Sequence, residues 1–207
     1  MPLPKINIIT RTGTRENCFR MLKKSIETQT YKNYVHYKTN DNIHNTFLKN
    51  EPNVIDVTHL RKKKTRQILC PYNLYLNEVT NKIKDGWVII IDDDAKFVHD
   101  KFLEYLAKLC AKKNPNEVFL YNIYFRQEKS IFPLNDSFRM GTFDMASICI
   151  HSSLLKTFHF TSRCGADFNL ISNLLRKGYI VRVERNFPIG VWGNYNGARK
   201  GRDIDCC

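Results

Sequence analysis

One run of apolar residues in the chain ends in three consecutive carboxylates. The run extends from Trp87 to Ile91, and Asp92, Asp93 and Asp94 follow it directly. A short stretch of β-branched residues after a glycine is typical of a buried strand in a parallel sheet. Three acidic side chains are costly beside a core unless positive charge lies against them, and ligands of open α/β sheets bind at the carboxyl ends of strands. The pattern therefore indicates a divalent cation that is held by oxygen ligands and carries a phosphorylated substrate; the alternative is an acidic turn that solvates the strand end.

The length and composition indicate a globular protein. The 207 residues suffice for one sizeable core, and 43% of them are apolar. No apolar stretch approaches the ~20 residues that a membrane span needs, and residues 1–5 lack the apolar segment of a signal peptide. We therefore expect a soluble, cytoplasmic protein without a membrane span. The Lys-, Asn- and Ile-rich composition suggests the AT-rich genome of a bacterium or a large DNA virus, in which case the location is the host cytoplasm.

The cysteines show no local pairing pattern. None of the seven forms a CxxC pair, which argues against a zinc site and against a disulfide framework. We therefore expect most of them to be buried thiols in a reducing compartment. The terminal pair Cys206-Cys207 has no evident structural reason and is compatible with a chain cut from a longer protein.

A net charge of +13 favours an anionic partner, either nucleic acid or a nucleotide diphosphate. The densest basic run, Arg61 to Arg66, has no interleaved aromatic residues, and the chain has no nucleic-acid-binding motif. The run is equally compatible with a solvated loop or helix face. We therefore expect no nucleic acid partner, although a basic nucleic-acid-binding protein stays an alternative.

Strand patterns alternate with helix patterns along the chain, which predicts an α/β protein with a parallel or mixed sheet and helices on both faces. No repeat or linker divides the sequence, so one domain is expected. The glycine motifs of nicotinamide-binding and P-loop proteins, the GxSxG elbow and metal-binding histidine spacings do not occur. The predicted strands comprise residues 6–10, 35–39, 54–57, 87–91, 118–124, 146–150 and 179–183, and the predicted helices include residues 19–30, 71–86, 102–109 and 167–177.

The order of these pieces resembles the GT-A glycosyltransferases of the large family 2 type. The first strand with its Thr-Arg turn, the segment Ser25–Asn33 and Asp41 after the second strand resemble the opening of that family. Pro71–Asn77, Asp85-Gly86-Trp87 and the triple Asp continue the match, and Gly165–Phe168 resembles the family's later acidic motif. The helix-end segment and the Asp motif are fairly specific together, whereas either alone is weak.

The resemblance covers roughly Ile6 to Gly178 and implies the GT-A fold. This is a Rossmann-like three-layer sandwich with a central, mostly parallel mixed sheet. The implied organisation is a nucleotide-binding half at about residues 1–98, an acceptor and catalytic half at about 99–190, and a flexible tail at 191–207. The chain is compatible with being the first domain of a longer protein.

The resemblance also implies a reaction. A metal-dependent, inverting hexosyl- or pentosyltransferase moves a sugar from a nucleotide diphosphate, with a UDP-sugar favoured, to a hydroxyl of a glycan or glycoprotein. Mn2+ or Mg2+ neutralises the charge that develops on the leaving diphosphate. Asp94 is the expected direct metal ligand, and Asp92 and Asp93 are expected at the ribose and the metal's waters. The triplet leaves the register ambiguous by one residue, so Asp92 is also a candidate ligand.

Further residues are implied in nucleotide-sugar binding: Thr10, Arg11 and Thr12 at the base and ribose, Asp41 as a hydrogen-bond acceptor for the base, Arg66 at the diphosphate or base, and Asn73 within a matched segment. For Arg15, a phosphate contact and a solvent-exposed arginine at a helix start are equally plausible.

Inverting transfer needs a base for the acceptor hydroxyl, and Asp167 matches the Asp of the late acidic motif. The family often has Glu-Asp there, whereas this chain has Ala166-Asp167. The alternative for Asp167 is a helix N-cap. Asp144, which is equally ordinary as a turn residue, and Trp192 in the tail are weaker candidates for contacts with the donor sugar or acceptor. The glycine-rich, basic tail is either a mobile flap over the diphosphate or an unstructured end.

Two other functions stay open besides nucleic-acid binding. One is a sugar-nucleotide nucleotidyltransferase, whose glycine-rich activating loop residues 11–15 resemble only faintly. The other is a nucleotide-sugar-binding domain without independent activity, because the chain offers little sequence for a separate acceptor-binding region.

Overall fold

A seven-stranded sheet forms the centre of the computed structural model, which describes residues 2–61, 69–125 and 129–193. Strand β9 is antiparallel to both of its neighbours, and all other neighbouring pairs are parallel. The predicted α/β class with a mostly parallel mixed sheet is therefore confirmed. In spatial order the strands are β10 (Ile180–Glu184), β6 (Glu117–Tyr121), β9 (Ile148–His151), β4 (Trp87–Ile90), β1 (Ile6–Thr12), β2 (Tyr34–Asn40) and β3 (Val54–Asp56).

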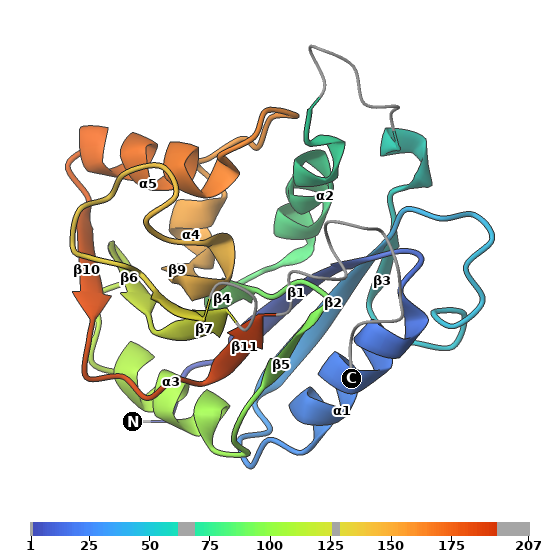
Figure 1. Cartoon of the computed structure of the whole chain (residues 1–207), viewed down its shortest axis with the longest axis horizontal. Helices are drawn as coiled ribbons and strands as arrows, with labels where there is room; N and C mark the ends of the chain where they lie inside the picture. The colour runs from blue at the N-terminus through green and yellow to red at the C-terminus, as the bar shows by residue number, and fades with distance from the viewer. Residues whose placement is uncertain (1, 62–68, 126–128, 194–207) are drawn as a thin grey trace.

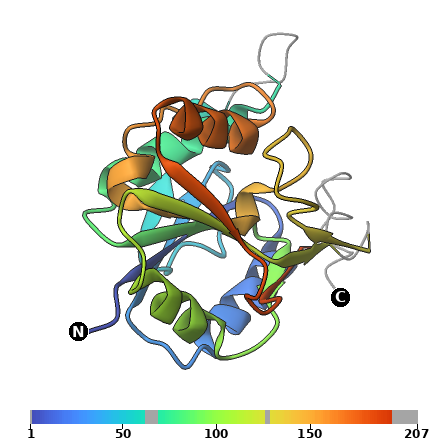
Figure 2. The same ribbon diagram turned by 90° about the vertical axis from the view of Figure 1, so that its left-hand side faces the viewer.

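Helices cover both faces of this sheet and complete three layers (Figure 1, Figure 2). On one face α1 (Glu16–Glu27) and α3 (Phe102–Cys110) pack with the sheet into one apolar cluster. On the other face a second cluster joins the sheet to α2 (Tyr75–Lys82), α4 (Ser152–Leu155) and α5 (Ala166–Arg176). Within the described ranges, short 3-10 helices lie at Thr58–Leu60, Pro71–Leu74 and Met145–Ser147.

The apolar pattern of the sequence explains these positions. Every residue of β4 is buried because helices cover both faces of the strand, as its unbroken apolar run predicts. In α1 the buried residues Phe19, Leu22 and Ile26 recur at helical spacing and form the face that packs on the sheet. No helix in the described ranges combines the length and apolar character that a membrane span needs.

A second, four-stranded sheet was not predicted. Its order is β5 (Ala95–Phe97), β11 (Val191–Gly193), β7 (Ile123–Phe125) and β8 (Ser130–Phe132). The predicted strand 118–124 is in fact two strands, β6 and β7, in different sheets. They separate at Asn122, whose side-chain amide donates hydrogen bonds of 2.9 Å to the carbonyls of Arg185 and Phe187. Residues 191–193 of the expected tail form β11, and residues 194–207 lie outside the described ranges.

The prediction of a chain without disulfides was wrong. Cys70 and Cys164 form a disulfide with a Cα–Cα distance of 5.4 Å, and Cys18 is also disulfide-bonded. Cys110 and Cys149 are buried free thiols, as expected. The two bonded residues of the first pair are separated by 94 positions, so no local spacing reveals them. Because disulfides are typical of oxidising compartments, the cysteines no longer support a reducing, cytoplasmic location.

Candidate active site

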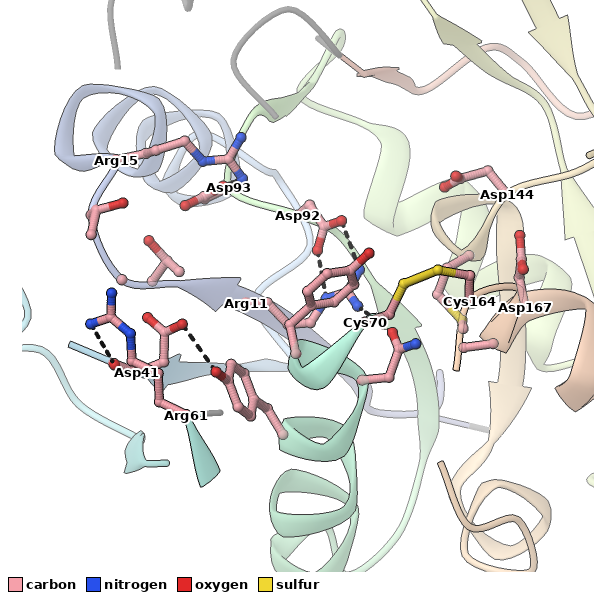
Figure 3. A pocket seen from close by; sticks show the side chains of 18 of the residues that line it. Arg11, Arg15, Asp41, Arg61, Cys70, Asp92, Asp93, Asp144, Cys164 and Asp167 are labelled. Carbon is pink, nitrogen blue, oxygen red and sulfur yellow. Dashed lines mark hydrogen bonds and ion pairs between the residues drawn. A yellow bond between two sulfur atoms is a disulfide. The ribbon is translucent and has the colours of Figure 1, made fainter. Parts of the chain in front are cut away.

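A cavity of about 570 Å3 lies at the carboxyl ends of β1 and β4, where the sheet was predicted to bind its ligand. Its walls come from loops that are far apart in the sequence and meet at this edge (Figure 3). The lining residues are 11–15 at the end of β1 and in the loop after it, Asp41 after β2, Arg61, Cys70, Tyr72, Asn73, Tyr75, Asp92, Asp93, Asp144, Met145 and 164–167.

Arg11 connects the first carboxylate of the triplet to the wall of the cavity. Its guanidinium donates two hydrogen bonds to Asp92, Nε to Oδ1 at 2.8 Å and Nη2 to Oδ2 at 2.7 Å. Nη1 donates to Oδ1 of Asn73 at 3.0 Å, and the guanidinium carbon lies 5.0 Å from the centre of the Tyr72 ring. The predicted residues Arg11, Asn73 and Asp92 are therefore brought together. The bidentate pair fixes the Asp92 carboxylate in one orientation.

Arg15 connects the other two carboxylates. Its guanidinium donates from Nη1 to Oδ2 of Asp94 at 2.9 Å and from Nη2 to Oδ1 of Asp93. The side chains of Asp93 and Asp94 are 1% and 10% exposed. Burial raises the pKa of Asp93 to about 7 and that of Asp94 to about 6, and Arg15 opposes both shifts. The positive charge that the sequence requires beside the triplet is thus supplied by arginine in this structure.

The triplet offers suitable ligands for a divalent cation, although few of them. Carboxylate oxygens are the donors that Mg2+ and Mn2+ prefer, and Asp92 and Asp93 lie on the cavity wall. Asp94, the expected direct ligand, is not among the lining residues, and its Oδ2 accepts a hydrogen bond from Arg15. Within the described ranges, no three His, Cys, Asp or Glu residues are grouped so as to hold a metal ion. A cation here would therefore draw further ligands from substrate phosphates and water, as Mg2+ commonly does.

Asp41 lies at another part of the cavity wall. It accepts a hydrogen bond of 3.1 Å from the Tyr75 hydroxyl at Oδ2, and its backbone carbonyl accepts one of 3.4 Å from Arg61. A Cβ at Gly13 would lie 1.8 Å from Oδ1 of Asp41, so any other residue there would require this carboxylate to move. The arrangement leaves Asp41 at the surface of the cavity, where the sequence predicted a contact with the base.

The two threonines of β1 differ in their positions. Thr12 lines the cavity. Thr10 is fully buried, and its hydroxyl lies 2.9 Å from Nε2 of His36 inside the sheet layer. The structure therefore does not bring Thr10 to the site.

Asp144 and Asp167 lie across the cavity from Asp92 and Asp93 (Figure 3). Asp167 is in the first turn of α5, and its Oδ1 accepts a hydrogen bond of 2.8 Å from the backbone N–H of Phe168. Burial raises the pKa of Asp167 above its usual range, which makes its carboxylate a stronger base. Asp144 caps the 3-10 helix Met145–Ser147 through a 2.8 Å hydrogen bond from the N–H of Ala146. The N-cap alternative for Asp167 is therefore wrong, because Gly165 is the N-cap residue of α5 and Asp167 lies inside the helix, whereas Asp144 combines a cap with a place on the cavity wall.

The disulfide forms part of the same wall and links the start of the 3-10 helix Pro71–Leu74 to the segment before α5 (Figure 3). Two hydrogen bonds accompany it, from the N–H of Cys70 to the carbonyl of Ser162 at 2.8 Å and from Nδ2 of Asn73 to the carbonyl of Arg163 at 2.9 Å. These contacts hold the two walls of the cavity together.

Two candidates are not brought to the cavity. Trp192 lies in β11, 38% exposed, with its ring 6.0 Å from that of Tyr124, and does not line the cavity. Arg66 lies outside the described ranges. Sequence reasoning gave no role to Tyr72 or Arg61, although Tyr72 belongs to the matched segment after Pro71 and Arg61 begins the basic run.

The sequence matches no protein-family model and no curated protein. Solved structures nevertheless share the fold. TarS of S. aureus superposes with a TM-score of 0.67 at 12% identity, over 93% of this chain and 37% of TarS. A structure of TarS residues 1–349 with UDP-GlcNAc gives 0.63 at 14% identity, over 92% of this chain and 58% of that one. The mannosyltransferase PcManGT from Pyrobaculum calidifontis, in complex with GDP-Man and Mn2+, gives 0.62 at 14% identity, over 94% and 57%.

These similarities establish the fold. The chain has the mixed α/β architecture of its GT-A glycosyltransferase neighbours, as the sequence predicted. It spans 37% to 58% of the length of the three neighbours described.

Proposed function

We propose that the chain is a glycosyltransferase that uses a nucleotide diphosphate sugar. The observation that supports this most directly is one cavity with two arginine–carboxylate clusters on one side and Asp167 on the other (Figure 3). The cavity lies at the ligand edge of a GT-A sheet. Structures of this fold that contain UDP-GlcNAc, or GDP-Man with Mn2+, support a nucleotide sugar as the ligand.

The cavity offers separate groups for the parts of such a donor. Asp41 is proposed to accept a hydrogen bond from the base, and Thr12 to contact the ribose. Arg11, Arg15 and Arg61 bring positive charge to a cavity whose ligand is anionic. A UDP-sugar is the favoured donor, in keeping with the UDP-GlcNAc complex of TarS.

Mn2+ or Mg2+ is proposed at the acidic triplet. Asp92 and Asp93 would hold it from the cavity wall, and Asp94 becomes available if Arg15 moves away. When bound, the cation would act as a Lewis acid and neutralise the charge that develops on the diphosphate. Arg11 contributes by holding the Asp92 carboxylate in a fixed orientation.

Asp167 is proposed to act as the base. Its carboxylate takes the proton of an acceptor hydroxyl as the acceptor oxygen bonds to the anomeric carbon of the sugar. The bond between that carbon and the diphosphate breaks, the nucleoside diphosphate leaves, and the configuration inverts. The Phe168 N–H fixes one oxygen of Asp167, so the other is available to the acceptor. The acceptor class is a hydroxyl of a glycan or glycoprotein.

A second candidate is a nucleotide-sugar-binding domain without activity of its own. It is supported by the extent of the match, because the chain spans only 37% of TarS and 57% of PcManGT. In this case the donor binds as proposed, and acceptor recognition requires additional sequence.

Isothermal titration with UDP, GDP and TDP, in Mn2+ and in EDTA, tests the donor proposal. We expect UDP binding that depends on Mn2+, with loss of affinity in Asp92→Asn. Asp136→Asn is the matched control, because Asp136 is an exposed carboxylate that pairs with Arg185 rather than lining the cavity. Tight, salt-steep binding of DNA or RNA that Asp92→Asn leaves unchanged, without nucleotide binding, would instead favour the nucleic-acid alternative.

A further inference from the structure

Arg15 occupies the place at the acidic triplet where positive charge is needed. It is the N-cap residue of α1, its side chain is 16% exposed, and it lies on the cavity wall. One guanidinium bridges two carboxylates, with Nη1 on Asp94 and Nη2 on Asp93. Because the side chain of Asp93 is 1% exposed, it depends on such a partner to stay ionised inside the fold.

The formal charge of the arginine–carboxylate cluster determines how strongly it attracts a divalent cation. Both oxygens of Asp92 are bound by Arg11, and Asp93 and Asp94 share Arg15. Three carboxylates and two guanidinium groups leave a formal charge of −1 (−3 + 2). A divalent cation would therefore meet little net attraction, and a guanidinium in its way, for as long as Arg15 stays bound.

The two arginines differ in their freedom to move. The two side chains are similarly exposed, Arg11 at 13% and Arg15 at 16%, but Arg11 directs three hydrogen bonds to Asp92 and Asn73 and its guanidinium lies against the Tyr72 ring. Arg15 contacts only the two carboxylates in the hydrogen bonds described for it, and it begins a helix at the rim of the cavity. A rotation of its long side chain is enough to turn the guanidinium toward a phosphate in that cavity. Its paired N–H donors match phosphate oxygens as well as carboxylates.

We propose that Arg15 is an exchangeable counter-ion of the triplet. It neutralises Asp93 and Asp94 before the donor binds, gives them up to the divalent cation that accompanies the donor, and turns to the diphosphate. The inference rests on the proposed function, and it adds that metal and donor bind cooperatively. The cation alone or the donor alone must compete with the ion pairs of Arg15. When both bind, the cation pairs with Asp93 and Asp94 and the diphosphate pairs with Arg15, so neither charge is left without a partner.

Titration of Mn2+ alone, without nucleotide, into the whole chain tests the exchange. Arg15→Gln removes the competing charge and is expected to bind Mn2+ about tenfold more tightly than the unmodified chain. Arg20→Gln is the matched control, because Arg20 is on the same helix but is exposed and paired with Glu16. It removes the same net charge and is expected to leave the Mn2+ affinity unchanged.

Titration of UDP in saturating Mn2+ tests the other half of the exchange. Arg15→Gln is expected to bind UDP about tenfold more weakly because the phosphate contact is lost, with Arg15→Lys between the two. Thermal melting gives a readout that does not depend on nucleotide. Removal of Arg15 leaves Asp93 unpaired, so Mn2+ is expected to raise the melting temperature of Arg15→Gln more than that of the unmodified chain.

Equal Mn2+ affinity in Arg15→Gln, Arg20→Gln and the unmodified chain would overturn the exchange. UDP binding that is the same in EDTA as in Mn2+ and is lost in Arg15→Gln would also overturn it, because the arginine would then replace the metal. If Arg15→Gln does not fold, Arg15→Lys takes its place, since one ammonium cannot bridge both carboxylates in the same way. A chain that binds no nucleotide would refute the proposed function, whereas the Mn2+ titration would still decide the competition at Asp93 and Asp94.

Discussion

Replacement of Cys70 and Cys164 by serine tests how far the disulfide supports the fold around the cavity. Serine is close in size to cysteine, so the change removes the covalent link with little effect on packing. The hydrogen bonds beside the link, from Cys70 N–H to Ser162 and from the Asn73 side chain to Arg163, remain possible in the variant. The native structure is therefore expected to persist, and the loss of stability to arise mainly in the unfolded chain.

The size of the loss follows from the sequence separation of 94 residues. A link that closes a loop of this size lowers the entropy of the unfolded chain, which corresponds to about 4.7 kcal/mol at 25 °C in the chain-entropy model. Residual structure in the unfolded chain makes this an upper value. Since domains are commonly stable by about 5–15 kcal/mol, the loss is a large part of the total.

Urea unfolding under oxidising conditions, followed by tryptophan fluorescence, measures the effect. Trp87 is 3% exposed in the native structure, so its emission reports unfolding of the central sheet. The double variant is expected to lose about 3–5 kcal/mol relative to the unmodified chain. The single variant Cys164→Ser serves as the control and is expected to lose as much, because either change breaks the same link.

A double variant that unfolds at the same urea concentration as the unmodified chain would refute this reasoning. The cavity walls would then be held by hydrogen bonds and packing alone. If the variant is already unfolded in buffer, the unmodified chain is expected to be stable by less than about 5 kcal/mol, which the same experiment measures.

Three further predictions concern the cavity. Asp167→Asn is expected to reduce the turnover rate by about 10²–10⁴-fold with little change in UDP affinity, as measured by transfer assays and titration; a parallel loss of UDP affinity would count against its role as base. Because burial raises the pKa of Asp167 and the base must be deprotonated, turnover is expected to fall as the pH drops through this raised value, and a rate that is flat down to about pH 4 would contradict the assignment. Tyr75→Phe removes the hydrogen bond to Asp41 and is expected to destabilise the fold by about 0.5–1.5 kcal/mol in urea unfolding, with Tyr105→Phe, an exposed tyrosine on α3, as the control.

The sequence was most informative where local pattern and burial agree. The apolar run before Asp92 predicted both the buried strand β4 and the need for positive charge beside the triplet. The Asp167 position was predicted at a helix start, and the structure places it at the start of α5 and on the cavity wall. These features depend on residues that are neighbours in the chain, which is why the pattern contains them.

The missed features depend on partners that are distant in the chain. Nothing near Cys70 indicates Cys164, and nothing near Arg15 indicates that its guanidinium bridges two carboxylates almost 80 positions away. The division of one predicted strand at Asn122 depends on carbonyls at Arg185 and Phe187. Periodicity reports which side of an element is buried, whereas these contacts are decided by which loops meet at the edge of the sheet.

The pairing of β5 has a consequence for how the site is made during synthesis. This strand directly follows Asp94 and lies at the edge of the smaller sheet, where its neighbour is β11, at Val191–Gly193. During synthesis, almost one hundred further residues must be added after β5 before its hydrogen-bonding partner β11 is available. A nascent chain that stops short of residue 191 can already place the triplet through β4 and the hydrogen bonds from Arg11 and Arg15, but the backbone of β5 beside it still lacks its strand partner. The β-sheet pairing next to the acidic residues is therefore completed only by a strand at the far end of the described chain.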